Sequence, residues 1–142
     1  MKKFNFELEK ILEYRNFEKQ QAEAELAKAI AVENQINENL KTIAAQYLAS
    51  KKEMEGNLNI DDILSLSRYN KLLDYQKEEL LNQLAQAKLV TSEKREILAQ
   101  IMKKTTALEK LKEKEEKTYR EEMKAEEKKF LDDLANKKRN II

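Results

Sequence analysis

Apolar and small residues follow the period of a helix along almost the whole chain. In the first arm they alternate steps of three and four, which is the spacing of a two-helix seam. This first track consists of Leu8, Leu12, Ala22, Leu26, Ala29, Ile36, Leu40, Ile43, Tyr47 and Met54. The same track also holds Arg15, Lys19, Glu33 and Ser50. Polar residues weaken such a seam but can fix its register, and long Lys or Arg stems still cover apolar surface.

A second helical track follows a short polar stretch. Asn59, with Asp62 three residues later, predicts an N-cap and a helix that begins near Ile60. The apolar positions of this arm are Ile63, Leu66, Tyr69, Leu73, Leu80, Leu84, Ala87, Val90, Ile97, Ile101, Leu108 and Leu111. A repeated step of three around Ala87 predicts a local change of supercoil. The basic run at 137–139 indicates where the helix ends.

Between the two tracks stands Gly56, the single glycine of a chain without proline. Glycine tolerates the left-handed conformation that ends many helices, and Asn57 and Asn59 add turn-forming residues. We therefore predict an all-α fold, a long antiparallel two-helix coiled coil in one domain over residues 1–142. Helix one is expected at about 5–55, the turn at 56–61 and helix two at about 62–139. The charged content of 39% fits this class.

The two predicted helices differ in length, at roughly 76 and 117 Å. A hairpin that turns near residue 58 would place Phe4 opposite about residue 112, so residues 113–142 are expected to overhang. The overhang carries an apolar stripe on one helical face, which predicts a partner surface. The stripe consists of Tyr119, Met123, Phe130 and Leu134. Self-association of the overhangs, or a solvated helix end, is the alternative.

The composition of the chain argues against catalysis, metal binding and nucleic-acid binding. The 28 basic and 27 acidic side chains nearly balance, so no general attraction to nucleic acid is expected. The chain has no His, no Cys and no Gly-rich phosphate loop, which removes the usual catalytic groups and metal ligands. No segment is as apolar as a signal peptide or a membrane span. We predict no enzyme activity, no cofactor, no metal, no nucleic-acid partner and no membrane insertion.

The chain resembles the FliJ family of the bacterial flagellar type III export apparatus. The resemblance rests on the order and spacing of motifs at both ends of the chain. The first motif comprises Phe4, Phe6, Leu8, Glu9, Leu12, Arg15 and Glu18, followed by Leu26, Ala27 and Ala29. The second comprises residues 108–114, Tyr119, Glu126, Glu127, Lys128, Leu131, Asp132, Asp133, Ala135 and a terminal basic cluster.

This resemblance implies a central-stalk-like coiled coil, similar to the shaft subunit of rotary ATPases. It implies a cytoplasmic protein, held peripherally at the inner membrane at the flagellar base and needed for motility and chemotaxis. The implied partners are a hexameric export ATPase, the cytoplasmic linker of the membrane export gate, and export chaperones. The alternative is a generic coiled-coil scaffold or chaperone, or the stalk of a non-flagellar type III secretion system.

The resemblance also implies two contact regions. The gate-facing region lies near the hairpin tip and comprises Ile43, Tyr47, Tyr69, Leu72, Gln76 and Leu80. Except for Leu72 and Gln76, these residues lie on or next to the seam, so packing within the hairpin is the competing interpretation; Leu72 should project outward. The ATPase-facing region comprises Phe4, Phe6, Tyr119, Met123, Phe130 and Leu134. Phe4 could instead fasten the start of helix one onto Leu111.

Overall fold

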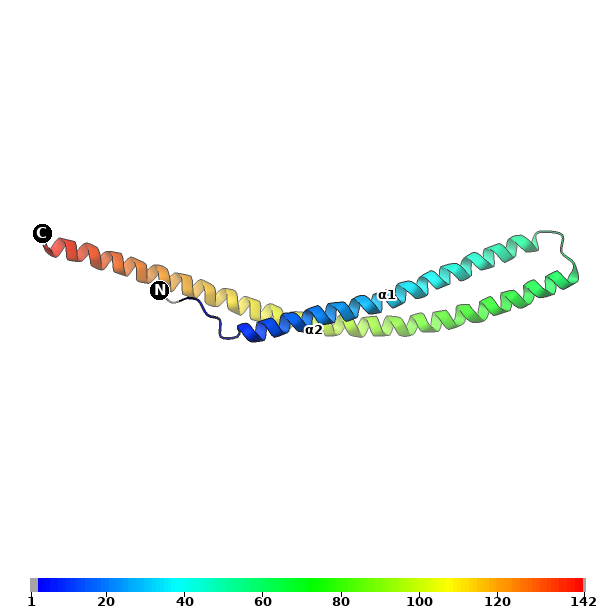
Figure 1. The fold of residues 1–142 in the computed structure, drawn as a ribbon, viewed down its shortest axis with the longest axis horizontal. Coiled ribbons are helices and arrows are strands. Elements are labelled where there is room, and N and C mark those ends of the chain that lie inside the picture. The colour runs from blue at the N-terminus through cyan, green and yellow to red at the C-terminus, as the bar shows by residue number, and fades with distance from the viewer. Residues whose placement is uncertain (1–2, 142) are drawn as a thin grey trace. The chain divides into compact units, whose positions relative to one another are not determined.

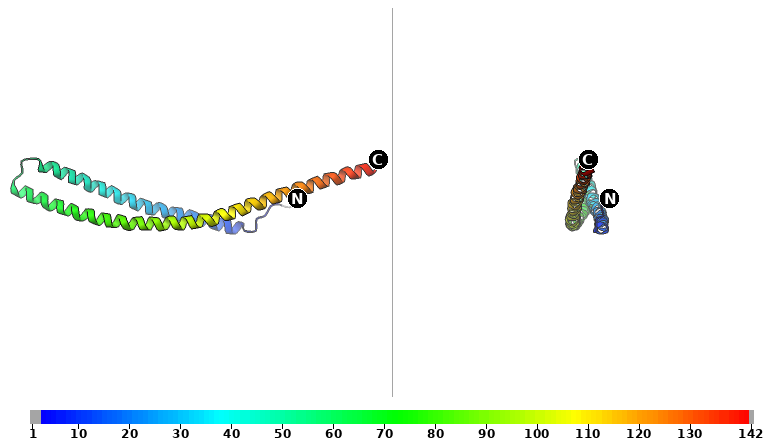
Figure 2. Two further views of the ribbon diagram at one scale, coloured as in Figure 1. Left: turned by 180° about the vertical axis from the view of Figure 1, so that it is seen from behind. Right: turned by 90° about the vertical axis from the view of Figure 1, so that its left-hand side faces the viewer.

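The computed structural model describes residues 3–141, with side chains assigned as far as Asn140, and it contains two long α-helices (Figure 1). Helix α1 spans Glu9–Met54, and helix α2 spans Ile60–Ile141. Figure 2 shows the two helices from behind and end-on. Within the described residues there is no strand. The predicted all-α helical hairpin, with the longer second helix, is confirmed.

The chain packs as two compact units. One unit is residues 21–99, which include the connection between the helices. The other combines residues 1–20 with 100–142, of which the structure describes 3–20 and 100–141. Each unit contains a stretch of α1 and a stretch of α2, so each has its own section of seam. We call them the tip unit and the terminal unit.

In the tip unit, the α1 residues that face the seam are alternately three and four positions apart, as predicted. Ala22, Ala29, Ile36 and Ile43 are buried, and they face a stretch of α2 in which Leu73 is only 1% exposed. The polar members of the track follow the same rule, since Glu33 is half-buried and Ser50 is buried. Only Met54, at the end of α1, departs from the predicted track by being exposed.

The α2 track differs from its prediction. Ile63, Tyr69, Val90 and Ile97 are exposed. For the last three, the position that turns inward is one residue further along: Asn70 is half-buried, Thr91 is buried and Leu98 is half-buried. With these replacements the steps of three and four alternate regularly through Ala87, so the predicted change of supercoil there is wrong.

Polar residues can occupy the α2 seam because each finds a partner nearby. Thr91 donates its hydroxyl hydrogen to the Ala87 carbonyl oxygen at 3.0 Å, so its methyl group can face the seam. Asn70 accepts a hydrogen bond from the Ser50 hydroxyl at 2.9 Å. A satisfied polar group costs little to bury. The neighbouring apolar side chains of Tyr69 and Val90 can therefore remain exposed to solvent.

The terminal unit is also held by a mixture of apolar and polar contacts. Phe6 and Leu12 are buried, at 4% and 5% exposure. Lys112 takes the seam position predicted for Leu111, which is exposed. The Lys112 ammonium lies 2.9 Å from Oε2 of Glu9, an ion pair that joins the start of α1 to α2. The hydrogen bond to Glu9 raises the pKa of Lys112, so the ammonium stays charged.

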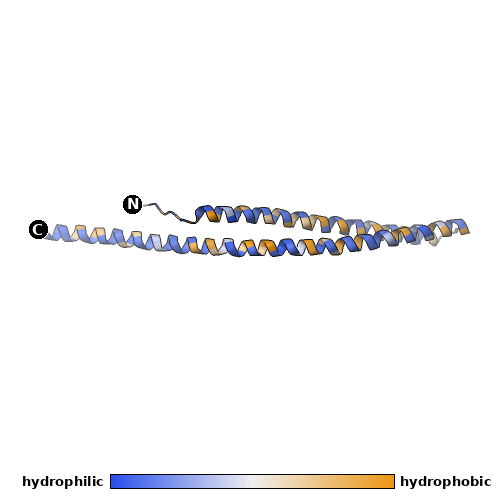
Figure 3. Cartoon of the chain, turned by 90° about the horizontal axis from the view of Figure 1, so that it is seen from below, coloured by the Kyte–Doolittle hydropathy of each residue, from blue (hydrophilic) through white to orange (hydrophobic). Residues whose placement is uncertain are grey.

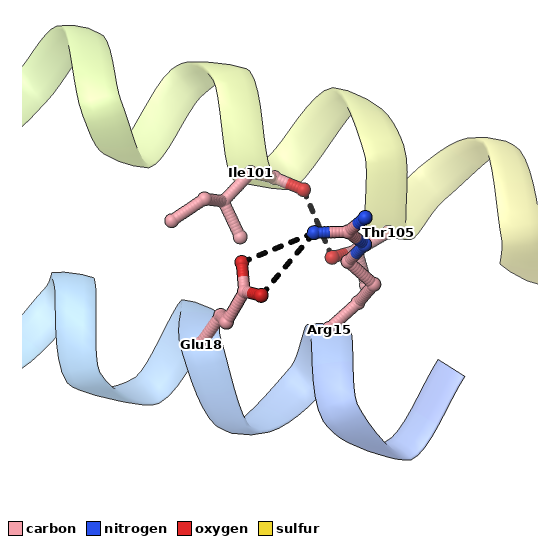
Figure 4. Close-up of polar contacts among 4 residues, drawn as sticks. All are labelled: Arg15, Glu18, Ile101 and Thr105. Atoms are coloured by element: carbon pink, nitrogen blue, oxygen red, sulfur yellow. Dashed lines mark hydrogen bonds and ion pairs between the residues drawn. The ribbon is translucent and has the colours of Figure 1, made fainter. Parts of the chain in front are cut away.

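Figure 4 shows how charged residues fit into this unit. Nη1 of Arg15 donates to both carboxylate oxygens of Glu18, at 3.2 and 3.3 Å, on the side of α1 that faces α2. The pair lies beside Ile101 and Thr105, and the Thr105 hydroxyl donates to the Ile101 carbonyl oxygen at 2.9 Å. Arg15 thus neutralises its neighbour while its stem covers the seam, as the sequence predicted.

Helix α1 begins at Glu9, four residues later than predicted, with Leu8 accepting the first helical hydrogen bond from the Leu12 amide at 2.9 Å. Residues 3–8 are not helical. A non-helical chain advances about 3 Å per residue against about 1.5 Å in a helix, so this segment reaches further along α2. Phe4 therefore meets Tyr119, with ring centroids 5.5 Å apart, and not residue 112.

The unpaired part of α2 is consequently shorter than predicted. The expected overhang of 113–142 is wrong in its first residues, because Phe4 pairs with Tyr119 and Met123 is half-buried. Every residue from Lys124 to Asn140 is exposed. We use the word overhang for residues 124–140. In Figure 3 this end of α2 is mostly hydrophilic, with hydrophobic turns recurring at intervals.

The connection between the helices comprises residues 55–59. Gly56 does not adopt a left-handed conformation, since no described residue has a positive φ angle. That part of the prediction is wrong, and the turn is made without the special freedom of glycine. The predicted N-cap is confirmed, because Oδ1 of Asn59 accepts a hydrogen bond from the Asp62 amide at 2.8 Å.

Candidate partner-binding surfaces

Three of the six predicted gate-facing residues come together in one open groove of the tip unit. Ile43 of α1 and Gln76 and Leu80 of α2 line it, and its volume is about 390 Å³. We call it the tip groove. Its other lining residues are Asn39, Thr42, Gln46, Glu79 and Gln83.

The tip groove is unusual for this chain in being almost uncharged. Glu79 is the one charged residue that lines it, although 39% of the chain is charged. Amide side chains can both donate and accept hydrogen bonds, and the apolar floor comes from the buried Ile43 and half-buried Leu80. The groove can therefore hold a segment that has apolar groups and free backbone polar groups.

Tyr47 is engaged within the hairpin. Its hydroxyl donates a hydrogen bond to Oδ1 of Asp74 on the other helix. This bond, with smaller contributions from desolvation and from the carboxylate charge, raises the pKa of Tyr47 to about 12. The side chain is half-buried. A partner that used the Tyr47 hydroxyl would have to displace Asp74.

Leu72 and Tyr69 lie outside the tip groove and are exposed. Leu72 is 51% exposed, as the predicted outward orientation requires, and Tyr69 is 38% exposed. Tyr75, on the same stretch of α2, is also exposed and was not singled out from the sequence. Apart from Tyr47, the predicted gate-facing residues thus belong either to the groove or to a separate exposed surface.

The predicted ATPase-facing residues form two groups, one that packs against other residues of the terminal unit and one that is exposed on the overhang. Phe6 is buried, and Phe4 packs on Tyr119. These aromatic residues serve first to fasten residues 3–8 to α2, and the fastening uses Tyr119 in place of the suggested Leu111. Phe130 and Leu134 stand on the overhang, at 63% and 44% exposure. Within the predicted stripe, these two side chains have a larger exposed fraction than Tyr119 and Met123, which are half-buried.

Residues of both ATPase-facing groups line shallow depressions. Phe4, Leu111 and Tyr119 line one of about 530 Å³, together with Lys3, Asn5, Lys114, Glu115, Thr118 and Glu122. Phe130 and Leu134 border another of about 400 Å³, with Asp133, Asn136, Lys137 and Asn140 around it. The overhang therefore combines an apolar strip with both signs of charge.

One exposed apolar surface escaped the sequence interpretation. Ile11, Tyr14 and Phe17 are all exposed on α1 of the terminal unit. Their spacing of three residues is a weaker helical pattern than the seam through Leu8 and Leu12, so they were not singled out from the sequence. Only a count of large apolar residues outside both tracks could have revealed them.

No group of acidic, His or Cys side chains that could hold a metal ion occurs among the described residues. Over the same part of the chain, neither helix has a stretch apolar and long enough to cross a membrane.

A comparison with protein families decides which family the chain belongs to. The model of the family described as "Flagellar FliJ protein" matches residues 4–139. This chain belongs to the FliJ family. Neither the curated proteins nor the solved structures gave a match. As a FliJ-family chain, it is a protein of flagellar export, and the family is one of non-enzymatic export components.

Proposed function

We propose that this FliJ-family protein is a central-stalk-like component of the flagellar type III export apparatus that engages the hexameric export ATPase. The observation that carries the proposal is the overhang. It presents Phe130 and Leu134 to solvent on a helix that has no intrachain cover from Lys124 to Asn140. An exposed apolar patch bordered by polar residues is typical of a surface that binds another protein.

The same proposal assigns the other end of the hairpin to the export gate. The cytoplasmic linker of the gate protein would use the tip groove and the exposed Leu72. The groove supports this role because its uncharged amide rim suits an extended segment with free backbone groups. Export chaperones are proposed as further partners, and the protein would sit peripherally at the cytoplasmic face of the inner membrane.

The test combines the full chain with its cognate export ATPase. We expect the wild-type chain to promote assembly of the hexamer and to raise ATP turnover. The F130A/L134A double variant should lose most of this stimulation, because it removes both exposed anchors. The matched control is Leu89→Ala, which truncates a 67% exposed leucine of the tip unit and should stimulate as the wild type does.

Two results would contradict the proposal. If the wild-type chain changes neither the assembly nor the turnover of the ATPase, the stalk role is wrong. If F130A/L134A stimulates fully, the overhang is not the contact. Binding through the tip groove without any ATPase response would favour the alternative, a coiled-coil scaffold or chaperone, or the stalk of a non-flagellar secretion system.

A further inference from the structure

Residues 3–8 form a non-helical segment that rests on α2 of the terminal unit, and we call this segment the strap. Phe6 is buried, Phe4 and Leu8 are half-buried, and the three residues that alternate with them are exposed. Such alternation is typical of an extended chain with one face on a surface. The aromatic side chains of the strap are therefore its attachment to α2.

The strap rests on the same face of α2 that carries the apolar stripe of the overhang. Tyr119 and Met123 are four residues apart, and so are Phe130 and Leu134. The interval of seven residues from Met123 to Phe130 is about two helical turns, so the four side chains share one face. Phe4 packs on Tyr119, with ring centroids 5.5 Å apart. The stripe is thus covered by the strap at Tyr119 and bare at Phe130 and Leu134.

We propose that the strap is an autoinhibitory segment, which competes with the partner of the overhang for this continuous face of α2. The inference rests on the proposed function, because it takes the export ATPase as that partner, and it adds how access to the site is controlled. It also reverses a role that the family resemblance implies. The resemblance makes Phe4 and Phe6 contacts of the ATPase, whereas here they shield α2 from it.

The bare part of the stripe is too small for a stable contact by itself. A specific interface covers about 800 Å² on each partner, and even a large aromatic side chain supplies only about 150–250 Å². The other large apolar side chains of the stripe are Met123 and Tyr119, and Tyr119 lies about 17 Å from Phe130 along the helix axis. A partner that covers Phe130 and continues along this face meets the strap at Tyr119. Full contact therefore requires the strap to leave.

The strap can leave without unfolding α1. The first helical hydrogen bond of α1 is accepted by Leu8, so detaching residues 3–7 leaves the helix in place. The ion pair between Glu9 and Lys112 follows the strap and holds the start of α1 on α2. Detachment exposes Phe6 and breaks the bond from the Glu9 amide to the Phe6 carbonyl oxygen, at 3.1 Å. Openings confined to a short segment of this kind are the least costly ones in a folded protein.

The first experiment measures ATP turnover of the cognate export ATPase against the concentration of the full chain. F4A/F6A removes both aromatic attachments of the strap. It should reach half-maximal stimulation at about a tenfold lower concentration than the wild type, because the binding face is then open in every chain. The matched control is N5A/E7A, which truncates two exposed residues of the same strap and should behave as the wild type does. Circular dichroism checks that both variants keep their helices.

The second experiment fixes the strap in place. Asn5 of the strap and Thr118 of α2 are both exposed and line the same depression. The chain contains no cysteine, so a short bis-methanethiosulfonate linker joins only the two thiols of N5C/T118C. The linked chain should lose most of its stimulation and regain it when dithiothreitol removes the linker. Thr118→Cys treated with the same reagent is the control, and it should stimulate as the unlinked N5C/T118C chain does.

Three outcomes would overturn this inference while leaving the proposed function intact. The first is an F4A/F6A variant that stimulates no better than the wild type. The second is an F4A/F6A variant that stimulates less, as direct contact of the ATPase with Phe4 or Phe6 requires. The third is a linked chain that stimulates fully. The proposed function is decided separately, by the response to the wild-type chain and to F130A/L134A.

Discussion

Ser50 of α1 donates a hydrogen bond to Asn70 of α2, with 2.9 Å between Oγ and Oδ1, across the seam of the tip unit. Ser50 is buried and Asn70 is half-buried. The two residues satisfy each other only in one alignment of the helices. A slip by one helical turn would leave both unpaired in the seam, so this pair favours the observed register over its neighbours.

We predict that Ser50→Ala lowers the free energy of unfolding by about 1 kcal/mol, because it leaves the Asn70 amide without its partner. The double variant S50A/N70L should recover that loss, since both seam positions become apolar. Urea unfolding followed by circular dichroism measures both values. Thr42→Ala removes an exposed hydroxyl from the same helix and should change little. A double variant less stable than Ser50→Ala would contradict the assigned role of the pair.

The pair also shows why the α1 track could be predicted more fully than the α2 track. In α1 the seam falls on apolar or small residues at most positions, so the period alone identifies it. In α2, Asn70 and Lys112 belong to the seam, while the apolar Tyr69 and Leu111 beside them are exposed. Their partners, Ser50 and Glu9, lie on the other helix. The sequence of one helix cannot show that a polar residue in it will find a hydrogen-bond or ion-pair partner on the other helix.

The candidate sites were predictable to a similar degree. Phe130 and Leu134 belong to a stretch with no partner helix, so their period and the difference in helix length were sufficient to predict that they are exposed. Phe4 and Phe6 belong to a non-helical segment, and its greater reach per residue moved them past their expected positions. The tip groove depends on side chains from both helices at a given register, and the sequence identified only Ile43, Gln76 and Leu80 of its lining.

Phe6 should matter more for stability than Phe4. Phe6 is 4% exposed, so Phe6→Ala should cost about 3 kcal/mol of local stability and release residues 3–8 from α2. Phe4 is half-buried and packs on one ring, so Phe4→Ala should cost about 1 kcal/mol. Hydrogen exchange at the first turn of α1 reports the release. Unchanged exchange in Phe6→Ala would show that this segment is held by other residues.

The Tyr47–Asp74 hydrogen bond predicts an unusual titration in alkali. The pKa of Tyr47 is raised from 10.0 to about 12, chiefly by the bond to Asp74. A raised folded-state pKa means that the stabilisation is complete below pH 10 and is lost as the pH passes through about 12. Tyrosinate absorbance should therefore include a late titration step from Tyr47.

Asp74→Asn should return this titration towards that of an ordinary tyrosine, and Tyr47→Phe should remove it. Tyr75→Phe, on an exposed tyrosine of α2, is the control and should leave the late step in place. Circular dichroism recorded in parallel shows whether the helices persist over the same range. A late step that survives Tyr47→Phe would assign the shifted pKa to another residue.

The connection between the helices should depend on Asn59 more than on Gly56. Gly56 has no positive φ angle, and a Cβ atom built there would lie 3.4 Å from the Glu53 carbonyl oxygen, an ordinary contact. Gly56→Ala should leave stability unchanged or raise it by up to about 1 kcal/mol, since alanine restricts the unfolded chain. Asn59→Ala removes the cap on the Asp62 amide and should cost about 1 kcal/mol. Urea unfolding of both variants gives the comparison, and Asn57→Ala serves as a control within the same connection. A larger loss in Gly56→Ala than in Asn59→Ala would show that the turn needs its glycine after all.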